Sequence, residues 1–381
     1  MTPSRPAEAT GAPPDLAGTR AAIRTFLAAD PVSREPHVDG WNRYDPAFSR
    51  RLGQAGFIGM TWPCDYGGHA RPALERYVVV EEICAAGAPA AAHWSADRQV
   101  GPALLRYGSE AQRRRLLPGM ARGETYFSLG MSEPESGSDL ASVRTRGTRV
   151  EGGWRLAGRK IWTSFAHDAH FALVLCRTSG TSEDRNAGLS QFIVPLDSPG
   201  LTIRPVVNMA GRHEFNEVLF DDVPLGEDAL LGQEGQGWAQ VTGELALERS
   251  GPERFLSSFV LLDALVRQDR ADGRIDRAGL IGALVARLVP LRGLSFAIAR
   301  EIDAGASVAS QAALVKELGS SFEQELPDIL IEALDVPADR SAEAPLGRLL
   351  AEAALHAPSF SIRGGTREIL RGIIARDMGL R

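Results

Sequence analysis

The chain has 381 residues, of which 44% are hydrophobic and 24% are charged, and its formal net charge is −6. This length suffices for two or three domains with a sizeable core, and the negative charge does not favour nucleic acid or an anionic membrane as a partner. The three cysteines are far apart and the seven histidines form no metal-binding motif, so we expect a cytoplasmic protein with no disulfide framework and no bound metal.

The first part of the chain is predicted to be helical. Residues 1–14 are rich in proline and alanine, lack the apolar core of a signal peptide, and are expected to be disordered. From residue 15 to residue 123 apolar residues recur at helical spacing, and Ser109 is predicted to cap a helix. The segment ALERYVVVEEICAAG is apolar around most of its circumference and predicts a buried helix.

Residues 124–235 have the pattern of strands. The runs HFALVLCRT, SQFIVPL, LTIRPVV and NEVLFDDV are short, rich in β-branched and aromatic residues, and separated by turn residues. Two further runs flank Gly152 and Gly153, which is the signal of a β-hairpin. Because strands and helices do not alternate, the pattern predicts a compact antiparallel β domain rather than a doubly wound sheet.

From residue 236 to residue 381 apolar residues return to spacings of three and four, which predicts a second helical domain. The order along the chain is therefore helical, β and helical, with no internal repeat. No apolar run in these zones approaches the roughly 20 residues that a membrane span needs, so we expect none.

Two motifs in the β zone could hold a cofactor. In GMSEPESGSD, residues 130–139, the hydroxyls of Ser132 and Ser138 can bond a polar edge, and Gly137 lets the backbone approach closely. The alternative is an ordinary polar turn. In KIWTSFA, residues 160–166, a strand would point Trp162 and Ser164 to one face, where the indole could stack on a flat heterocycle. The alternative is a core tryptophan.

A third motif, RGGTREILRGIIAR, lies at residues 363–376 near the end of the sequence. Gly364 and Gly365 allow a close approach of backbone to a ligand, and Thr366 can cap the helix that follows. Glu368 lies in the first turn of that helix, where a negative charge suits the helix dipole. The alternative is a terminal helix that merely follows a glycine-rich turn.

Together, in this order, the three motifs resemble those of the acyl-CoA dehydrogenase family of flavoproteins. The stretches LGQAGFIGMTWPCDYGG and LLRYGSEAQRRRLLPGMARGE resemble the helical domain of that family, and the resemblance covers residues 45–260 and 358–381. It implies a mainly α fold with an N-terminal helical domain at 15–123, an antiparallel, barrel-like β domain at 124–235 and a C-terminal four-helix bundle at 236–381.

The resemblance implies FAD as the cofactor, held between the β domain and the C-terminal helices. It assigns Ser132 to the flavin ring, Ser138 to the CoA chain as well as the cofactor, and Ser164 to the flavin edge. The positions that match family contacts with FAD are Met131, Ser132, Gly137, Ser138, Trp162, Thr163, Ser164, Thr366 and Glu368.

The implied reaction is α,β-desaturation of an acyl thioester. A carboxylate removes a proton from Cα while a hydride leaves Cβ for flavin N5, and the backbone N–H of Gly364 supports the thioester oxygen. Most members carry the base immediately before the Gly-Thr pair, where this chain has Gly364. A smaller branch carries it in a Leu-Glu-Arg helix motif, and Leu247-Glu248-Arg249 matches that motif. We therefore expect Glu248 to be the base and Arg249 its supporting cation, against the reading of Glu248 as a surface charge.

The sequence departs from the family where FAD is held across a dimer interface. The Arg-x-x-Phe-Gly run and the Gly-Gly-aromatic-Gly loop are missing, and we expect either a homo-oligomer (dimer or tetramer) or a heterotetramer. The expected partners are an acyl-CoA or acyl-carrier-protein thioester and an electron-transfer flavoprotein. Alternatives are a flavin oxidase or monooxygenase, or a non-catalytic partner subunit of a heteromeric acyl-CoA dehydrogenase.

Overall fold

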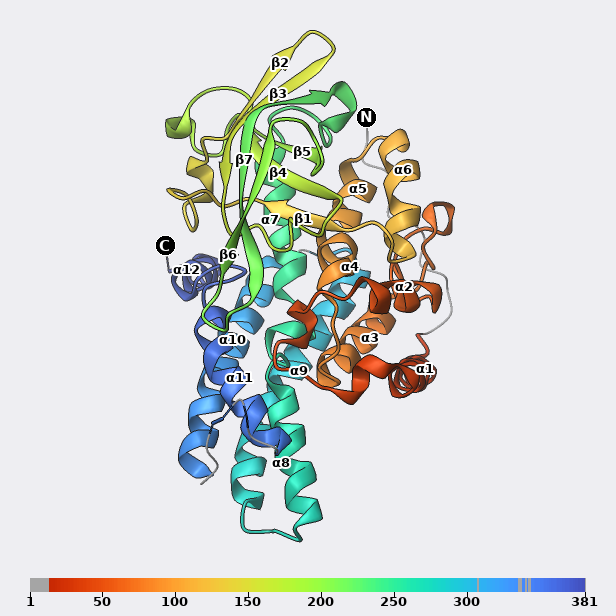
Figure 1. Ribbon diagram of the computed structural model, residues 1–381, viewed down its shortest axis with the longest axis vertical. Helices are drawn as coiled ribbons and strands as arrows, with labels where there is room; N and C mark the ends of the chain where they lie inside the picture. Colours follow the sequence, from red (N-terminus) through yellow and green to blue (C-terminus); the bar gives the residue numbers. More distant parts are fainter. Residues whose placement is uncertain (1–13, 307, 335–337, 340, 342–343, 381) are drawn as a thin grey trace. The chain divides into compact units, whose positions relative to one another are not determined.

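The computed structural model describes residues 14–380, apart from 307, 335–337, 340 and 342–343. The N-terminus expected to be disordered, residues 1–14, lies outside the described residues except for Pro14. Contacts divide the chain into two units, which we call the helical unit (Met1–Arg43, Ala70–Ala90 and Ala246–Arg381) and the β unit (Tyr44–His69 and Ala91–Leu245). The predicted order of helical, β and helical segments is confirmed (Figure 1), while the predicted domain boundaries stay predictions.

The β unit contains a sheet in the strand order β1–β4–β2–β3–β7–β6, with β5 paired to β4. The strands are β1 (Phe127–Gly130), β2 (Arg146–Val150), β3 (Gly153–Lys160), β4 (Phe171–Arg177), β5 (Leu189–Pro195), β6 (Leu201–Val207) and β7 (His213–Gly226). The predicted hairpin is confirmed, since β2 and β3 pair antiparallel across a turn in which Gly152 has φ +78. The sheet is not wholly antiparallel, because β1 runs parallel to β4.

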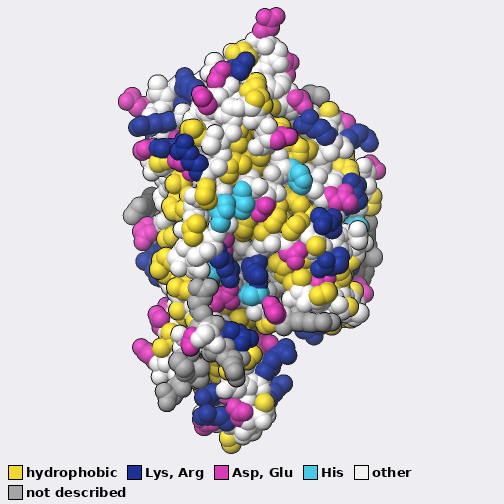
Figure 2. Space-filling view, in the orientation of Figure 1, with side chains coloured by type: hydrophobic (Ala, Val, Ile, Leu, Met, Phe, Trp, Pro, Cys, Tyr) yellow, Lys and Arg dark blue, Asp and Glu magenta, His cyan; other side chains and the backbone are white. Residues whose placement is uncertain are grey.

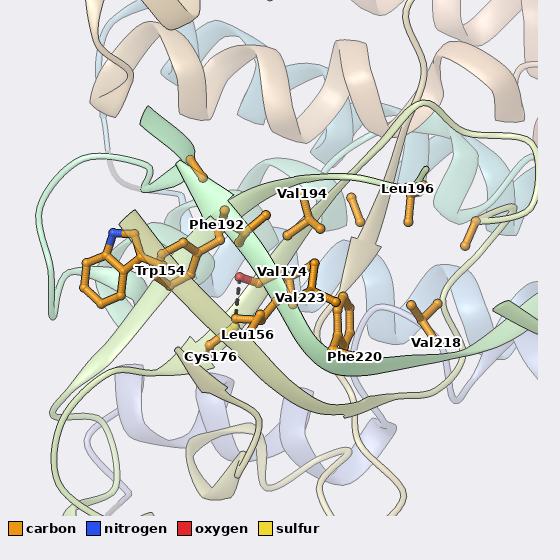
Figure 3. Close-up of a cluster of buried hydrophobic side chains, with 14 residues drawn as sticks. Trp154, Leu156, Val174, Cys176, Phe192, Val194, Leu196, Val218, Phe220 and Val223 are labelled. Atoms are coloured by element: carbon orange, nitrogen blue, oxygen red, sulfur yellow. Dashed lines mark hydrogen bonds between the residues drawn. The ribbon is translucent and has the colours of Figure 1, made fainter. Parts of the chain in front are cut away.

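The core of the β unit comes from alternate residues of its strands. Trp154 and Leu156 on β3, together with Phe192 on β5, are buried side chains of one cluster, and Figure 3 shows them turned toward one another. The rings of Trp154 and Phe192 meet edge to face with centroids 5.0 Å apart, a favoured geometry for aromatic pairs. This packing gives the unit a stable platform for the loops that leave its strands.

The helices of the β unit are α2 (Pro46–Gln54), α4 (Ala91–Ser95), α5 (Gly101–Tyr107), α6 (Glu110–Ala121) and most of α7 (Gly237–Arg249). The prediction that Ser109 caps a helix is confirmed, because its side chain accepts from the backbone N–H of Gln112. The Gln112 side chain accepts in return from the Ser109 backbone, which completes a capping box.

The helical unit holds α1 (Leu16–Ala29), α3 (Ala73–Ala85), α8 (Phe259–Ala271), α9 (Ala278–Asp303), α10 (Ala309–Ala333), α11 (Pro345–Phe360) and α12 (Arg367–Asp377). Helix α10 packs against α9, α11 and α12, while α3 packs against α1 and α9. The predicted burial of α3 is confirmed, with Tyr77, Val78 and Val79 among its buried residues. Helix α10 is therefore the common support for the elements that carry the C-terminal motif.

Helix α9 is more apolar than the sequence analysis expected. By length and composition alone it could cross a membrane. It nevertheless carries Arg292, whose guanidinium pairs with Glu81 of α3 at 2.5 Å, and it packs against α3 and α10. These contacts make α9 a helix of this bundle.

Charges of both signs are mixed on the face shown in Figure 2. Exposed ion pairs of the molecule include Arg115–Asp228 at 2.8 Å in the β unit and Arg287–Glu325 at 2.7 Å in the helical unit. Exposed pairs of this kind contribute little to stability. The three cysteines are free, as expected.

Candidate active site

Glu248 lies at the C-terminal end of α7, and Arg254 follows it in the short turn Pro252–Arg254. The Arg254 guanidinium donates to the backbone oxygen of Glu248 at 3.0 Å and makes an ion pair with Oε1 of the same residue. Arg254 is almost completely buried, and its guanidinium lies over the ring of Trp41. A single arginine therefore fixes both the end of the helix and the direction of the Glu248 carboxylate.

Gly364 lies beside this carboxylate although it is more than a hundred residues away in sequence. A Cβ atom at position 364 would stand 3.0 Å from Oε1 and 3.3 Å from Oε2 of Glu248. The φ of Gly364 is +66, a conformation that glycine adopts without strain. The carboxylate of Glu248 thus reaches the place where a side chain at position 364 would begin.

Arg249 ties the same two segments together. Its Nε donates to the backbone oxygen of Gly364 at 2.8 Å, and the side chain is buried. Burial lowers the pKa of Arg249, while the charge of Glu248 opposes that shift. The N–H of Gly364 donates to no group in the described part of the chain. The helical unit therefore brings together Glu248, Arg249 and Gly364, three of the four residues that the sequence analysis assigned to catalysis and substrate; the fourth, Ser138, lies in the β unit.

Helix α12 holds the end of the glycine loop. Thr366 occupies its N-cap position and Glu368 its first turn, but the Thr366 hydroxyl makes no capping bond to the helix backbone. Thr366 thus occupies the predicted N-cap position, but the prediction that its hydroxyl caps the helix is wrong. Arg367 and Arg371 both pair with Glu317 of α10, at 3.2 Å and 2.8 Å, and so dock α12 on the bundle.

In the β unit, the loop at residues 131–139 is anchored by a buried ion pair. The ammonium of Lys160 bonds Oε1 of Glu133 at 2.8 Å and the backbone oxygen of Met131 at 2.9 Å. The backbone N–H groups of Arg144 and Thr145 also donate to Glu133. Burial alone would raise the pKa of Glu133, but Lys160 and these donors hold it below its usual value. The loop that carries Ser132, Gly137 and Ser138 is therefore fixed at its base.

The prediction that Trp162 and Ser164 lie on one strand and face the same way is wrong. Strand β3 ends at Lys160, and Trp162 has φ +60, which turns the chain out of the strand. Thr163 still exchanges backbone hydrogen bonds with Asn216 of β7, so the segment stays attached to the sheet. The loop at 131–139 lies next to it, because Ile161 N–H donates to the oxygen of Ser132 at 2.9 Å.

Two polar groups of this site were missed by the sequence analysis. Arg254 lies six residues after Glu248, and Lys316 lies in the apolar run AALVKELG of α10. Its Cε is 3.3 Å from the position of a Cβ at Gly364. A lone lysine on an apolar helix face was the available signal for it.

Comparison with known proteins identifies the family. The acyl-CoA dehydrogenase N-terminal domain matches residues 14–124, and the acyl-CoA dehydrogenase middle domain matches residues 128–223. Acyl-CoA dehydrogenase IpdE1 of Mycobacterium tuberculosis is 33% identical over 339 residues, which cover 88% of this chain and 87% of that protein.

Solved structures agree. The ChsE4–ChsE5 complex from Mycobacterium tuberculosis has a chain 27% identical to this one, with a TM-score of 0.83 over 98% of this chain and 99% of that chain. The Tcur3481–Tcur3483 steroid ACAD is 25% identical, with a TM-score of 0.83 over 97% and 98% of the two chains. The chain belongs to the acyl-CoA dehydrogenase family, whose members are FAD-binding oxidoreductases.

The residues of the β unit suit a flavin. The hydroxyl of Thr163 is buried and has no hydrogen-bond partner among the described residues. The neighbouring Trp162 is 56% exposed, whereas tryptophan is highly buried on average. An orphaned hydroxyl next to an open aromatic face fits a planar ring with polar edge atoms. The prediction of FAD as cofactor is confirmed by the family, and the individual contacts stay predictions.

Proposed function

We propose that the chain is a catalytically active FAD-dependent acyl-CoA dehydrogenase in which Glu248 removes the α-proton of an acyl thioester. The observation that carries this proposal is the approach of both Glu248 carboxylate oxygens to within 3.3 Å of the Cβ position of Gly364. Position 364 is where the resemblance locates the base of most family members. The carboxylate of Glu248 on α7 reaches the same place although position 248 is far from position 364 in the sequence.

The surroundings of Glu248 suit a general base. Arg254 makes an ion pair with Oε1, which orients the carboxylate. Oε2 is buried and has no hydrogen-bond partner in the described part of the chain, so one lone pair is free to take a proton. The alternative of a solvated surface charge does not agree with this burial.

The free N–H of Gly364 gives a donor for the thioester oxygen as negative charge develops on it. When bound, FAD accepts the hydride that leaves Cβ. The β unit would hold it through Ser132, Trp162, Thr163 and Ser164. Arg249 keeps the glycine loop in place through its bond to the Gly364 oxygen.

Replacing Glu248 tests the proposal. Glu248→Gln keeps the shape and an acceptor for Arg254 but cannot take a proton, so anaerobic bleaching of the flavin by acyl-CoA should fall by a factor of roughly 10³ or more while the yellow colour remains. Glu325→Gln, at an exposed pair on α10, is the matched control and should bleach normally. Normal bleaching by Glu248→Gln would show that the base is elsewhere.

We also infer that the enzyme works as an oligomer and that its thioester carries CoA. Two of the similar structures are complexes or steroid enzymes by name, so the substrate panel should include steroid-derived as well as branched and straight-chain acyl-CoAs. Electron-transfer flavoprotein as acceptor and a cytoplasmic location belong to the same proposal. Yellow protein obtained only on co-expression with a second family member would favour a heteromer, and rapid peroxide release would favour an oxidase.

A further inference from the structure

Lys316 is a buried lysine that lies against the proposed base. Its side chain is 1% exposed. The ammonium donates to the hydroxyl of Ser320 and, at 2.6 Å, to the backbone oxygen of Phe360 at the end of α11. Its Cε and the carboxylate of Glu248 both lie within 3.3 Å of the Cβ position of Gly364, so the two side chains border the same space.

Lys316 has charged neighbours from several elements. Those that act on its charge are Glu248 of α7, Arg254 of the following turn, Glu323 of α10 and Arg363 of the segment before α12. Other nearby charges are already paired: Glu317 with Arg367 and Arg371 of α12, Arg287 of α9 with Glu325, and Asp39 with Arg363. Two arginines therefore disfavour a further positive charge at Lys316, while two glutamates favour it.

We propose that Lys316 is a positioning residue that controls the reaction through its charge: its ammonium group holds back proton transfer to Glu248, and its neutral amine permits it. This inference rests on the proposed role of Glu248. Taking up a proton removes the negative charge of the carboxylate, while the electron pair of the broken Cα–H bond forms the Cα=Cβ double bond as the hydride departs. A cation beside the carboxylate therefore stabilises the start of the transfer more than its end. Loss of the lysine proton to solvent removes that opposition.

The titration of Lys316 supports this control. Burial, with the charges of Arg254 and Arg363, lowers the pKa of Lys316 to about 7, against the opposing effect of Glu323 and Glu248. A lysine in this range changes charge near neutral pH. Because Lys316 and the carboxylate border the same glycine in a partly screened site, loss of the charge should speed the transfer by roughly tenfold.

The test is the pH dependence of flavin reduction in the holoenzyme, followed by anaerobic rapid mixing at saturating acyl-CoA from about pH 6 to about pH 9. The wild-type rate should rise roughly tenfold through an inflection near pH 7. Lys316→Met, a neutral side chain of similar shape, should abolish the inflection and raise the low-pH rate toward the high-pH value. Lys316→Gln should do the same if the methionine variant folds poorly.

Glu323 needs its own control, because burial raises its pKa to about 7 as well. Glu323→Gln keeps an acceptor for the Ser257 N–H and leaves Lys316 in place. It should retain the inflection. An inflection that survives Lys316→Met, is lost in Glu323→Gln, or is missing from the wild type overturns the proposal.

A second measurement reads the charge of Lys316 without the reaction. In the unfolded chain the lysine keeps its usual pKa near 10.5, so the folded state binds fewer protons between about 7 and 10.5 and gains stability as the pH rises. The urea midpoint of Lys316→Met should therefore be higher than that of the wild type. The difference should be largest at about pH 6 to 7 and should shrink toward about pH 10. A urea-midpoint difference that does not change with pH indicates a purely structural lysine.

If Glu248→Gln still bleaches, the proposed function fails. If it does not bleach and the pH profiles are unchanged by Lys316→Met, only the lysine proposal fails.

Discussion

The variant Gly364→Ala, compared with a second glycine variant, separates two reasons for a glycine at this position: its positive φ and the nearby carboxylate of Glu248. Gly364 has φ +66 and its Cβ position is 3.0 Å from Oε1 of Glu248. Gly273 has φ +67 in the same helical unit, and nothing lies within 4 Å of its Cβ position. Gly273→Ala therefore has the same backbone strain without the contact, and the difference between the two variants reports the contact alone.

Both variants should lose about 1–2 kcal/mol of unfolding free energy from left-handed backbone strain. Gly364→Ala should lose a further ~1 kcal/mol or more, because Arg254 holds Oε1 and the carboxylate cannot move away without weakening that ion pair. A displacement of a few tenths of an ångström in the base should slow flavin reduction by roughly tenfold or more, since a full ångström can cost about a hundredfold.

Urea unfolding of each variant gives the first quantity, and anaerobic flavin reduction at saturating acyl-CoA gives the second. We expect Gly273→Ala to reduce flavin at the wild-type rate. The reasoning is refuted if Gly364→Ala does the same, or if both variants lose equal stability, because the methyl group would then not press on Glu248.

Two further predictions concern the β unit. Both carboxylate oxygens of Glu244 are buried, and burial raises its pKa from 4.5 to about 8 against the opposing effect of Gln191. The folded state then binds more protons than the unfolded chain between these two pKa values, so the unfolding free energy of the wild type falls by about 1.4 kcal/mol per pH unit over at most this window. Urea unfolding at about pH 5 and about pH 8 should show that Glu244→Gln removes this dependence on pH. The same dependence in the variant would contradict the burial of Glu244. Trp162→Ala should weaken FAD binding to the apoprotein roughly tenfold in a fluorescence titration, with little change in stability because Trp162 is exposed. Met209→Ala, which also replaces an exposed side chain, is the control. Equal FAD affinity of the two variants would argue against stacking of the indole on the flavin.

Patterns with a regular period predicted the fold well. The hairpin at Gly152 and the buried helix α3 follow from residue periodicity and turn chemistry, which act over a few neighbouring residues. The turn at Trp162 could not be predicted this way. Its left-handed backbone is held by pairing of Thr163 with Asn216, and a tryptophan gives no local hint of positive φ.

The proposed base was assigned from a sequence motif, but the residues around it could not be predicted. Arg254 and Lys316 reach Glu248 only because α10 and the turn after α7 pack in one unit. Sequence spacing between positions 248, 316 and 364 carries no period that would bring them together. The charges around Glu248 are therefore set by tertiary packing, whereas the proposal of Glu248 as base came from a local sequence motif.

The contact between Glu248 and Gly364 links the choice of base to the choice of loop residue. A carboxylate that comes from α7 fills the volume in which a side chain at position 364 would start, so the two residues constrain each other. The positive φ of Gly364 disfavours any replacement as well. A glycine at this position is thus what the α7 carboxylate requires sterically. The missing acid in the glycine loop argues for catalysis by Glu248 rather than against catalysis.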